Sequence, residues 1–193
     1  MTRTAKAPRI DRMGASWEKR TSNDAKWRRG WHFIALSIVL AIAVSAVLWW
    51  RLPVSAPSVE VVSLQGERIA LDALRGKVVL INFWATDCVP CRREMPAMAE
   101  TYRRYRPHGL EAIFIAMPYD RPDLVLHFTR SSELPFPVAL DVQGEAARAF
   151  GGVRATPTAF LVDKHGRIVE RILGVPDFDR LQALIERKLA EPA

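Results

Sequence analysis

The two cysteines of this chain, Cys88 and Cys91, are the residues whose types and spacing point most directly to chemistry. Two residues separate them, so the pair can close a small disulfide ring and open it again. An apolar run at residues 78–84 precedes the pair, and a helical pattern follows it. In the first turn of a helix, unpaired N–H groups and the positive end of the helix dipole favour a thiolate. The arrangement therefore predicts thiol–disulfide exchange.

Two other uses of the cysteine pair fit the sequence less well. A structural zinc site needs about four ligands, but the chain has no second cysteine pair, and its four histidines are scattered without ligand spacing. We therefore expect no bound metal. A purely structural disulfide is the other alternative, although a bridge that closes so short a loop constrains the unfolded chain little.

The positive charge of the chain is concentrated in an N-terminal tail. Over 193 residues the formal net charge is +7. Residues 1–30 contain nine lysines and arginines against three acidic residues, whereas residues 31–193 contain 19 basic and 18 acidic residues. The globular part is thus close to neutral, so we expect no binding to nucleic acid. Hydrophobic residues make up 49% of the chain, which is enough to bury a core.

Residues 31–50 form an uncharged segment of twenty residues (WHFIALSIVLAIAVSAVLWW) directly after the basic tail. A helix of this length spans about 30 Å, the thickness of the hydrocarbon core of a bilayer. Tryptophans at both ends of the segment suit the two membrane interfaces. A buried core helix is the alternative, but such a helix would not be apolar on every face. We expect a single transmembrane helix that holds the chain in the lipid bilayer.

The basic tail, residues 1–30, also predicts the orientation of this span, because loops rich in lysine and arginine stay in the cytoplasm. The N-terminus is then cytoplasmic, and the rest of the chain lies on the periplasmic face of a bacterial inner membrane. A cleaved signal peptide is the alternative, with residues 54–56 as a small-residue site, but Pro57 would follow the cut. Residues 51–57 are expected to be a linker. Either way the cysteines work outside the cytoplasm, where disulfides persist.

The pattern after the linker predicts a layered α/β domain over residues 58–193. Buried strands are expected at residues 77–84 and 110–117, with a helix from Cys88 between them. Asp120, with Pro122 just inside, predicts the start of a second helix that runs to about residue 132. The remaining expected elements are two short strands between residues 59 and 71, a strand at 136–140, a helical turn at 145–150, a hairpin of strands 158–162 and 167–173, and a last helix from Asp177.

The order of strand, Cys-x-x-Cys and helix, with Thr156-Pro157 later before a hairpin, resembles the thioredoxin fold. Within that fold, residues 84–96 (WATDCVPCRREMP) resemble the membrane-anchored TlpA/ResA/CcmG (DsbE) group of thiol–disulfide oxidoreductases. The similarity covers roughly residues 58–190, and the expected membrane anchor agrees with it. The resemblance implies a central mixed β-sheet flanked by helices, preceded by one transmembrane helix.

The resemblance also implies a role for four residues. Cys88 would be the exposed nucleophile, whose thiolate attacks a partner disulfide and forms a mixed disulfide. Cys91 would be the more buried thiol that resolves it and releases the partner. Pro157 would be a cis-proline that faces the cysteines, and the backbone of Thr156 would turn outward to pair with an incoming extended polypeptide.

Four neighbouring residues complete the expected site. Glu94 matches the acidic residue typical of the group, where a carboxylate would disfavour thiolate and could relay protons; an ordinary surface glutamate is the alternative. Trp84 and Pro90 belong to the same motif and would support the active site. Asn82 stands where ordinary thioredoxins carry a buried acid, and asparagine is familiar there in the anchored group.

The favoured function is an anchored reductase of disulfides in exported proteins, with no cofactor of its own. The group's usual clients are the haem-binding cysteines of apocytochrome c or copper-site cysteines, and electrons would come from a membrane carrier of the DsbD or CcdA type. A disulfide-forming oxidase is an alternative, but it would usually carry a histidine within the Cys-x-x-Cys and a larger helical insertion. A Sco-type copper chaperone would require the spacing Cys-x-x-x-Cys. A thiol peroxidase would carry its cysteine in a different motif. A redox-silent scaffold would not need both cysteines.

Asp87 departs from the group, which usually has tryptophan directly before the first cysteine. A carboxylate beside Cys88 favours the neutral thiol and so raises the pKa of Cys88, which lowers its reactive fraction at neutral pH. We predict that Asp87→Trp lowers the pKa of Cys88. A thiolate absorbance titration of the reduced protein measures this pKa, and no change or a rise would contradict the electrostatic argument.

Overall fold

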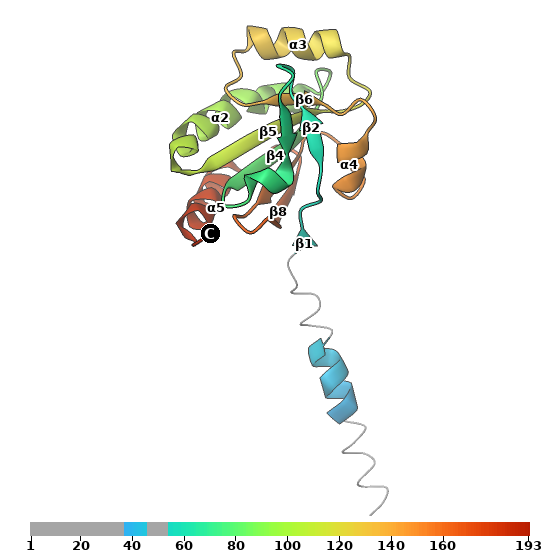
Figure 1. Cartoon of the computed structure of the whole chain (residues 1–193), viewed down its shortest axis with the longest axis vertical. Coiled ribbons are helices and arrows are strands. Elements are labelled where there is room, and N and C mark those ends of the chain that lie inside the picture. Colours follow the sequence, from blue (N-terminus) through green and yellow to red (C-terminus); the bar gives the residue numbers. More distant parts are fainter. Residues whose placement is uncertain (1–36, 46–53) are drawn as a thin grey trace, which may run out of the picture. The chain divides into compact units, whose positions relative to one another are not determined.

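The computed structural model describes residues 37–45 and 54–193 (Figure 1). Residues 37–45 form a helix, and within the described residues no helix is long and apolar enough to cross a membrane. The other positions of the expected transmembrane helix, 31–36 and 46–50, lie outside the described residues, as does the basic tail. The described residues 54–193 belong to one compact unit.

The centre of this unit is a six-stranded mixed sheet with the strand order β1-β8-β7-β4-β5-β6. Its strands are β1 (Val54–Ser55), β4 (Val78–Trp84), β5 (Leu110–Ala116), β6 (Val138–Leu140), β7 (Thr158–Val162) and β8 (Arg167–Leu173). Strands β4, β5 and β6 are parallel, whereas β7, β8 and β1 add antiparallel pairs on the other side. A separate antiparallel pair joins β2 (Glu60–Val62) to β3 (Arg68–Ala70).

Helices cover both faces of the sheet (Figure 1). They are α2 (Val89–Tyr105), α3 (Pro122–Ser131), α4 (Glu145–Ala149) and α5 (Phe178–Ala190), with short 3-10 turns η1 (Leu71–Leu74) and η2 (Arg106–His108). Residues from α2, α3 and α5 pack in one buried cluster, and residues from α4 pack in another. Gly109 adopts a left-handed conformation (φ 103°) after η2, which lets the chain turn back into β5.

Strand β4 is buried along its whole length, as the apolar run predicts. Successive side chains of a strand point to opposite faces of the sheet. Leu80 and Trp84 therefore pack in the cluster that contains residues of α2 and α5, while Ile81 and Phe83 pack in the cluster on the α4 side. Because β4 is fixed from both sides, the residues that follow its last position start from a rigid edge of the sheet.

Two local predictions differ from the structure. Residues 54–55, inside the expected linker, form β1 and pair with β8, because the chain meets the free edge of that strand. The second helix starts one residue later than predicted from Asp120. The N-cap position of α3 is Arg121, whose side chain makes no capping hydrogen bond. The prediction at the last helix is confirmed, since the Asp177 side chain caps α5 by accepting from the N–H of Arg180.

Candidate active site

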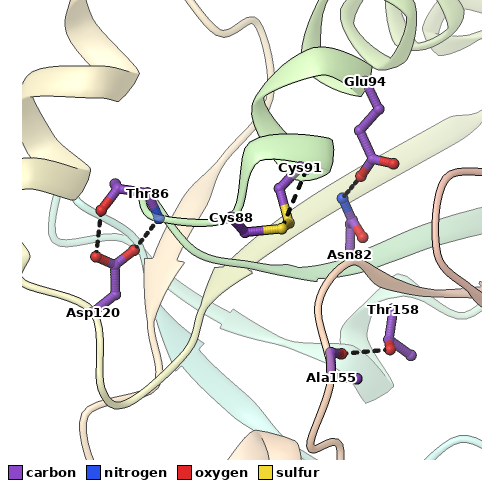
Figure 2. The surroundings of a disulfide bond; sticks show 8 residues. All are labelled: Asn82, Thr86, Cys88, Cys91, Glu94, Asp120, Ala155 and Thr158. Atoms are coloured by element: carbon purple, nitrogen blue, oxygen red, sulfur yellow. Dashed lines mark hydrogen bonds between the residues drawn. A yellow bond between two sulfur atoms is a disulfide. The ribbon is translucent and has the colours of Figure 1, made fainter.

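The two cysteines lie where β4 passes into α2, at the carboxyl edge of the sheet. They form a disulfide with their Cα atoms 5.3 Å apart. Cys88 is the N-cap residue of α2, and its Sγ accepts a hydrogen bond from the N–H of Cys91 at 3.2 Å (Figure 2). The leading sulfur thus occupies the end of the helix where free N–H groups and the helix dipole favour negative charge.

The two sulfurs differ in their access to solvent. Cys91 is fully buried in the cluster below α2, whereas Cys88 is partly exposed and packs at the margin of that cluster. Its neighbours Asp87, Val89 and Pro90 are exposed. A partner sulfur can therefore reach Cys88 and not Cys91. This asymmetry is what a nucleophilic and a resolving thiol require.

Glu94 is a buried carboxyl rather than a surface glutamate, with only 2% of its surface exposed. It lies three residues after Cys91 on α2, a spacing that places two side chains on the same face of a helix. The amide of Asn82 on β4 donates a hydrogen bond to Oε1 of Glu94 at 2.9 Å (Figure 2). Oε2 of Glu94 and Oδ1 of Asn82 have no partner among the described residues.

Burial raises the pKa of Glu94 from its ordinary 4.5 to about 7, although the Asn82 amide opposes the shift by favouring the charged form. The pKa of this carboxyl therefore lies near neutral pH. Such a group can both take up and give a proton near its own pKa. The structure accordingly places a proton-exchanging group on the face of α2 that carries the buried thiol.

Trp84 and Pro157 occupy buried positions around the site. Trp84 is fully buried and its ring packs against Phe128 of α3, with centroids 5.3 Å apart. Because it is buried, Trp84 supports the packing under the site and does not contact a client. The Thr156–Pro157 peptide bond is cis, as the resemblance implies. Pro157 directly precedes β7, which pairs with β4, so its loop lies at the same edge of the sheet as Cys88.

The proline loop is held by its own hydrogen bonds. The hydroxyl of Thr158 donates to the carbonyl of Ala155 at 2.7 Å (Figure 2), and the N–H of Gly174 donates to the carbonyl of Pro157 at 2.8 Å. Thr156 is half-buried, and its backbone N–H and C=O make none of the hydrogen bonds found among the described residues. One extended segment of a partner could therefore pair with the backbone of Thr156.

Two features of this edge are not predicted by the sequence pattern. Thr86 and Asp120, from the loops after β4 and β5, are joined by side-chain hydrogen bonds (Figure 2). Leu173 and Val175, at and just beyond the end of β8, leave 69% and 50% of their surface exposed. The register of the β7–β8 pair, which sets Thr158 opposite Leu173, brings them beside the proline loop. Neither feature has a local sequence signal, because the position of each depends on how segments distant in sequence pack together.

Glu94→Gln should change how stability depends on pH. The folded-state pKa of Glu94 is raised, so the carboxyl costs nothing while it is protonated in both states, below about pH 4.5. The free-energy cost of the buried carboxylate grows between about pH 4.5 and about pH 7 and then levels off at about 3 kcal/mol. In urea unfolding of the oxidised protein, the variant should equal the parent near pH 4 and exceed it in stability at pH 8. Glu100→Gln, on the exposed face of α2, is the matched control and should match the parent at both values. Equal stability of parent and Glu94→Gln at pH 8 would contradict the raised pKa.

Known proteins share the sequence pattern and the fold of this chain. Residues 54–171 match the AhpC/TSA family. The chain is 39% identical to the thiol-disulfide oxidoreductase ResA of Bacillus thuringiensis subsp. konkukian over 133 residues, which covers 68% of this chain and 75% of that protein.

Solved structures show the same fold. A putative thiol:disulfide interchange protein DsbE from Chlorobium tepidum superposes with a TM-score of 0.66 at 28% identity, over 72% of this chain and 97% of that one. A putative thioredoxin from Neisseria meningitidis gives a TM-score of 0.65 at 32% identity, over 70% and 90%. Together with the partly exposed and the buried cysteine at the start of α2, these similarities confirm the predicted thioredoxin fold and enzyme class. The chain belongs to the AhpC/TSA family of thioredoxin-like proteins and is a thiol–disulfide oxidoreductase of the TlpA/ResA/CcmG type.

Proposed function

We propose that this oxidoreductase is held in the bacterial inner membrane and reduces disulfides of exported proteins on the periplasmic side. The observation that carries the proposal is the pairing of an accessible sulfur at the N-terminus of α2 with a fully buried one behind it. The clients we favour are proteins whose cysteines must be reduced before they bind haem, as in cytochrome c maturation, or copper. No cofactor takes part, because the two thiols carry both electrons.

The first step is attack by Cys88. Its thiolate, stabilised at the helix N-terminus, attacks one sulfur of the client disulfide. The client S–S bond breaks, one client thiolate leaves, and a mixed disulfide joins Cys88 to the client. Meanwhile Cys91 stays buried on the inner face of α2 and does not compete for the client.

The second step is attack by Cys91 on the sulfur of Cys88, which releases the second client thiolate and forms the Cys88–Cys91 disulfide. Two electrons pass to the client, and both of its sulfurs leave as thiolates that take up protons. Cys91 must lose its proton to attack, although it has no access to water. Glu94, with its pKa near 7, is the group that accepts this proton.

Client docking uses the surface beside the cysteines. An extended client segment would pair with the free backbone groups of Thr156, while apolar client side chains contact Val89, Leu173 and Val175, all of them exposed. The negative charge of Asp87 in place of a tryptophan would alter which clients bind. We therefore expect client choice to differ from that of relatives with an aromatic residue there.

Anchoring in the lipid bilayer would come from residues 31–50, whose length and lack of charge suit a transmembrane helix. To act as a reductase repeatedly, the oxidised pair must be reduced again. A membrane thiol–disulfide carrier of the DsbD or CcdA type would supply the two electrons. A basic tail before the span favours a cytoplasmic N-terminus.

The reduction potential of the Cys88–Cys91 couple tests the direction of the reaction. We expect a value near or below that of thioredoxin, about −270 mV, when the protein is equilibrated in thiol buffers. A value nearer that of DsbA, about −120 mV, would make the protein an oxidant that forms disulfides. That result would overturn the reductase proposal in favour of the alternative function.

Cys91→Ala should trap clients that Cys88→Ala does not. Without the resolving thiol, the mixed disulfide at Cys88 has no internal attacker and should accumulate in the membrane fraction. Non-reducing electrophoresis after acid quenching detects the adducts, and mass spectrometry identifies them. Release of the protein from membranes by alkaline carbonate would refute the anchor. Adducts on Cys88→Ala at the level of Cys91→Ala would refute the assigned roles.

A further inference from the structure

The carboxylate of Asp120 holds Thr86 by two short hydrogen bonds. Oδ2 accepts from the backbone N–H of Thr86 at 2.6 Å, and Oδ1 accepts from its hydroxyl at 2.6 Å (Figure 2). Oδ1 also accepts from the N–H of the next residue, Arg121, at 2.9 Å. Bonds to a charged carboxylate are stronger than bonds between neutral groups. Asp120 therefore ties the loop after β5 to the loop after β4.

Other hydrogen bonds fix Asp120 itself. Strands β4 and β5 are parallel neighbours, so the loops that follow them leave the same edge of the sheet. The N–H of Met117 donates to the carbonyl of Trp84 at 2.9 Å, which joins the two loops at their base. The N–H of Asp120 then donates to the carbonyl of Met117 at 2.9 Å and closes a turn. The carboxylate is thus presented from a fixed position.

The residue that Asp120 holds lies two positions before the nucleophile. The N–H of Cys88 donates to the carbonyl of Ala85 at 3.2 Å, so Thr86 sits inside the turn that ends at Cys88. Cys88 in turn caps α2 and accepts the N–H of Cys91. A shift of Thr86 would therefore move the sulfur away from the N–H groups that stabilise a thiolate.

We propose that Asp120 and Thr86 are positioning residues that hold Cys88 at the N-terminus of α2 while the thiols are reduced. In the disulfide form, the bond to Cys91 already restrains the Cys88 sulfur. After reduction that restraint is gone, and the turn from Ala85 to Cys88 must keep the sulfur in place. Within the part of the chain that the structure describes, the side chain of Asp120 makes no capping hydrogen bond to the first turn of α3, since its bond on that side goes to the N–H of Arg121, the N-cap residue itself.

Thr86→Val tests the positioning role without changing any charge. The variant keeps the shape and the N–H bond but loses the hydroxyl bond to Asp120. The probe is 5,5′-dithiobis(2-nitrobenzoate), a small disulfide that needs no protein docking, added to the reduced full-length protein in detergent. Attack by Cys88 forms a mixed disulfide and releases one nitrothiobenzoate, whose absorbance gives the rate. We expect the rate to fall about tenfold and the pKa of Cys88 to rise.

Three further variants separate positioning from charge and from loss of folding. Thr86→Ser retains the hydroxyl and should restore the parental rate. Asp120→Ala should lower the rate at least as much as Thr86→Val, and Asp123→Ala, which removes a nearby exposed carboxylate, should leave it unchanged. A rate for Thr86→Val within about twofold of the parent, or an Asp120→Ala variant that reacts faster, would overturn the proposal. So would a loss of rate that Thr86→Ser shares, or one that far-ultraviolet circular dichroism traces to unfolding.

Discussion

The burial of β4 on both faces is the constraint on which the active site depends. All seven of its residues are buried, so the strand has one register and one direction in the sheet. The chain leaves its end at Trp84 and needs only a short turn to reach α2. Because α2 packs on the same face of the sheet as Trp84, the start of that helix is fixed above the sheet edge. The position of Cys88 is therefore set by the packing of β4 and α2.

The same alternation along β4 explains the buried pair beneath the cysteines. Asn82 lies on the face that α2 covers, two residues from Trp84 in one direction and from Leu80 in the other. A helix that packs on this face brings Glu94 over the strand, where the amide of Asn82 supplies the one side-chain hydrogen bond that Glu94 makes among the described residues. One amide does not replace the water that the carboxylate lost, so the pKa of Glu94 rises. A group that is costly to bury thus lies where, in the proposed mechanism, a buried thiol must exchange a proton.

The charged side chains near the two sulfurs differ in their burial. Asp87 and Arg92 are exposed beside Cys88, where water screens them, while Glu94 lies below the surface. The exposed residues therefore bear on which partner approaches and, in the case of Asp87, on the pKa of Cys88, whereas the buried Glu94 bears on proton exchange near Cys91. The loops after β4 and β5, joined by Thr86 and Asp120, act through geometry and not through these charges. They set the geometry in which the first sulfur meets the helix N-terminus.

The amino-acid sequence by itself determined the elements and the chemistry of this protein. The apolar run of β4, the cysteine spacing and the hairpin around Asp163 are local patterns, and each local pattern appeared in the structure close to its predicted bounds. Tertiary structure alone decided which polar side chains meet. Asp120, two residues before Pro122, fits the start of a helix by its local sequence, yet its carboxylate binds Thr86, 34 residues away in the chain. The burial of Glu94 and the pairing of β1 with β8 were likewise decided by packing between segments distant in sequence, which local propensity does not encode.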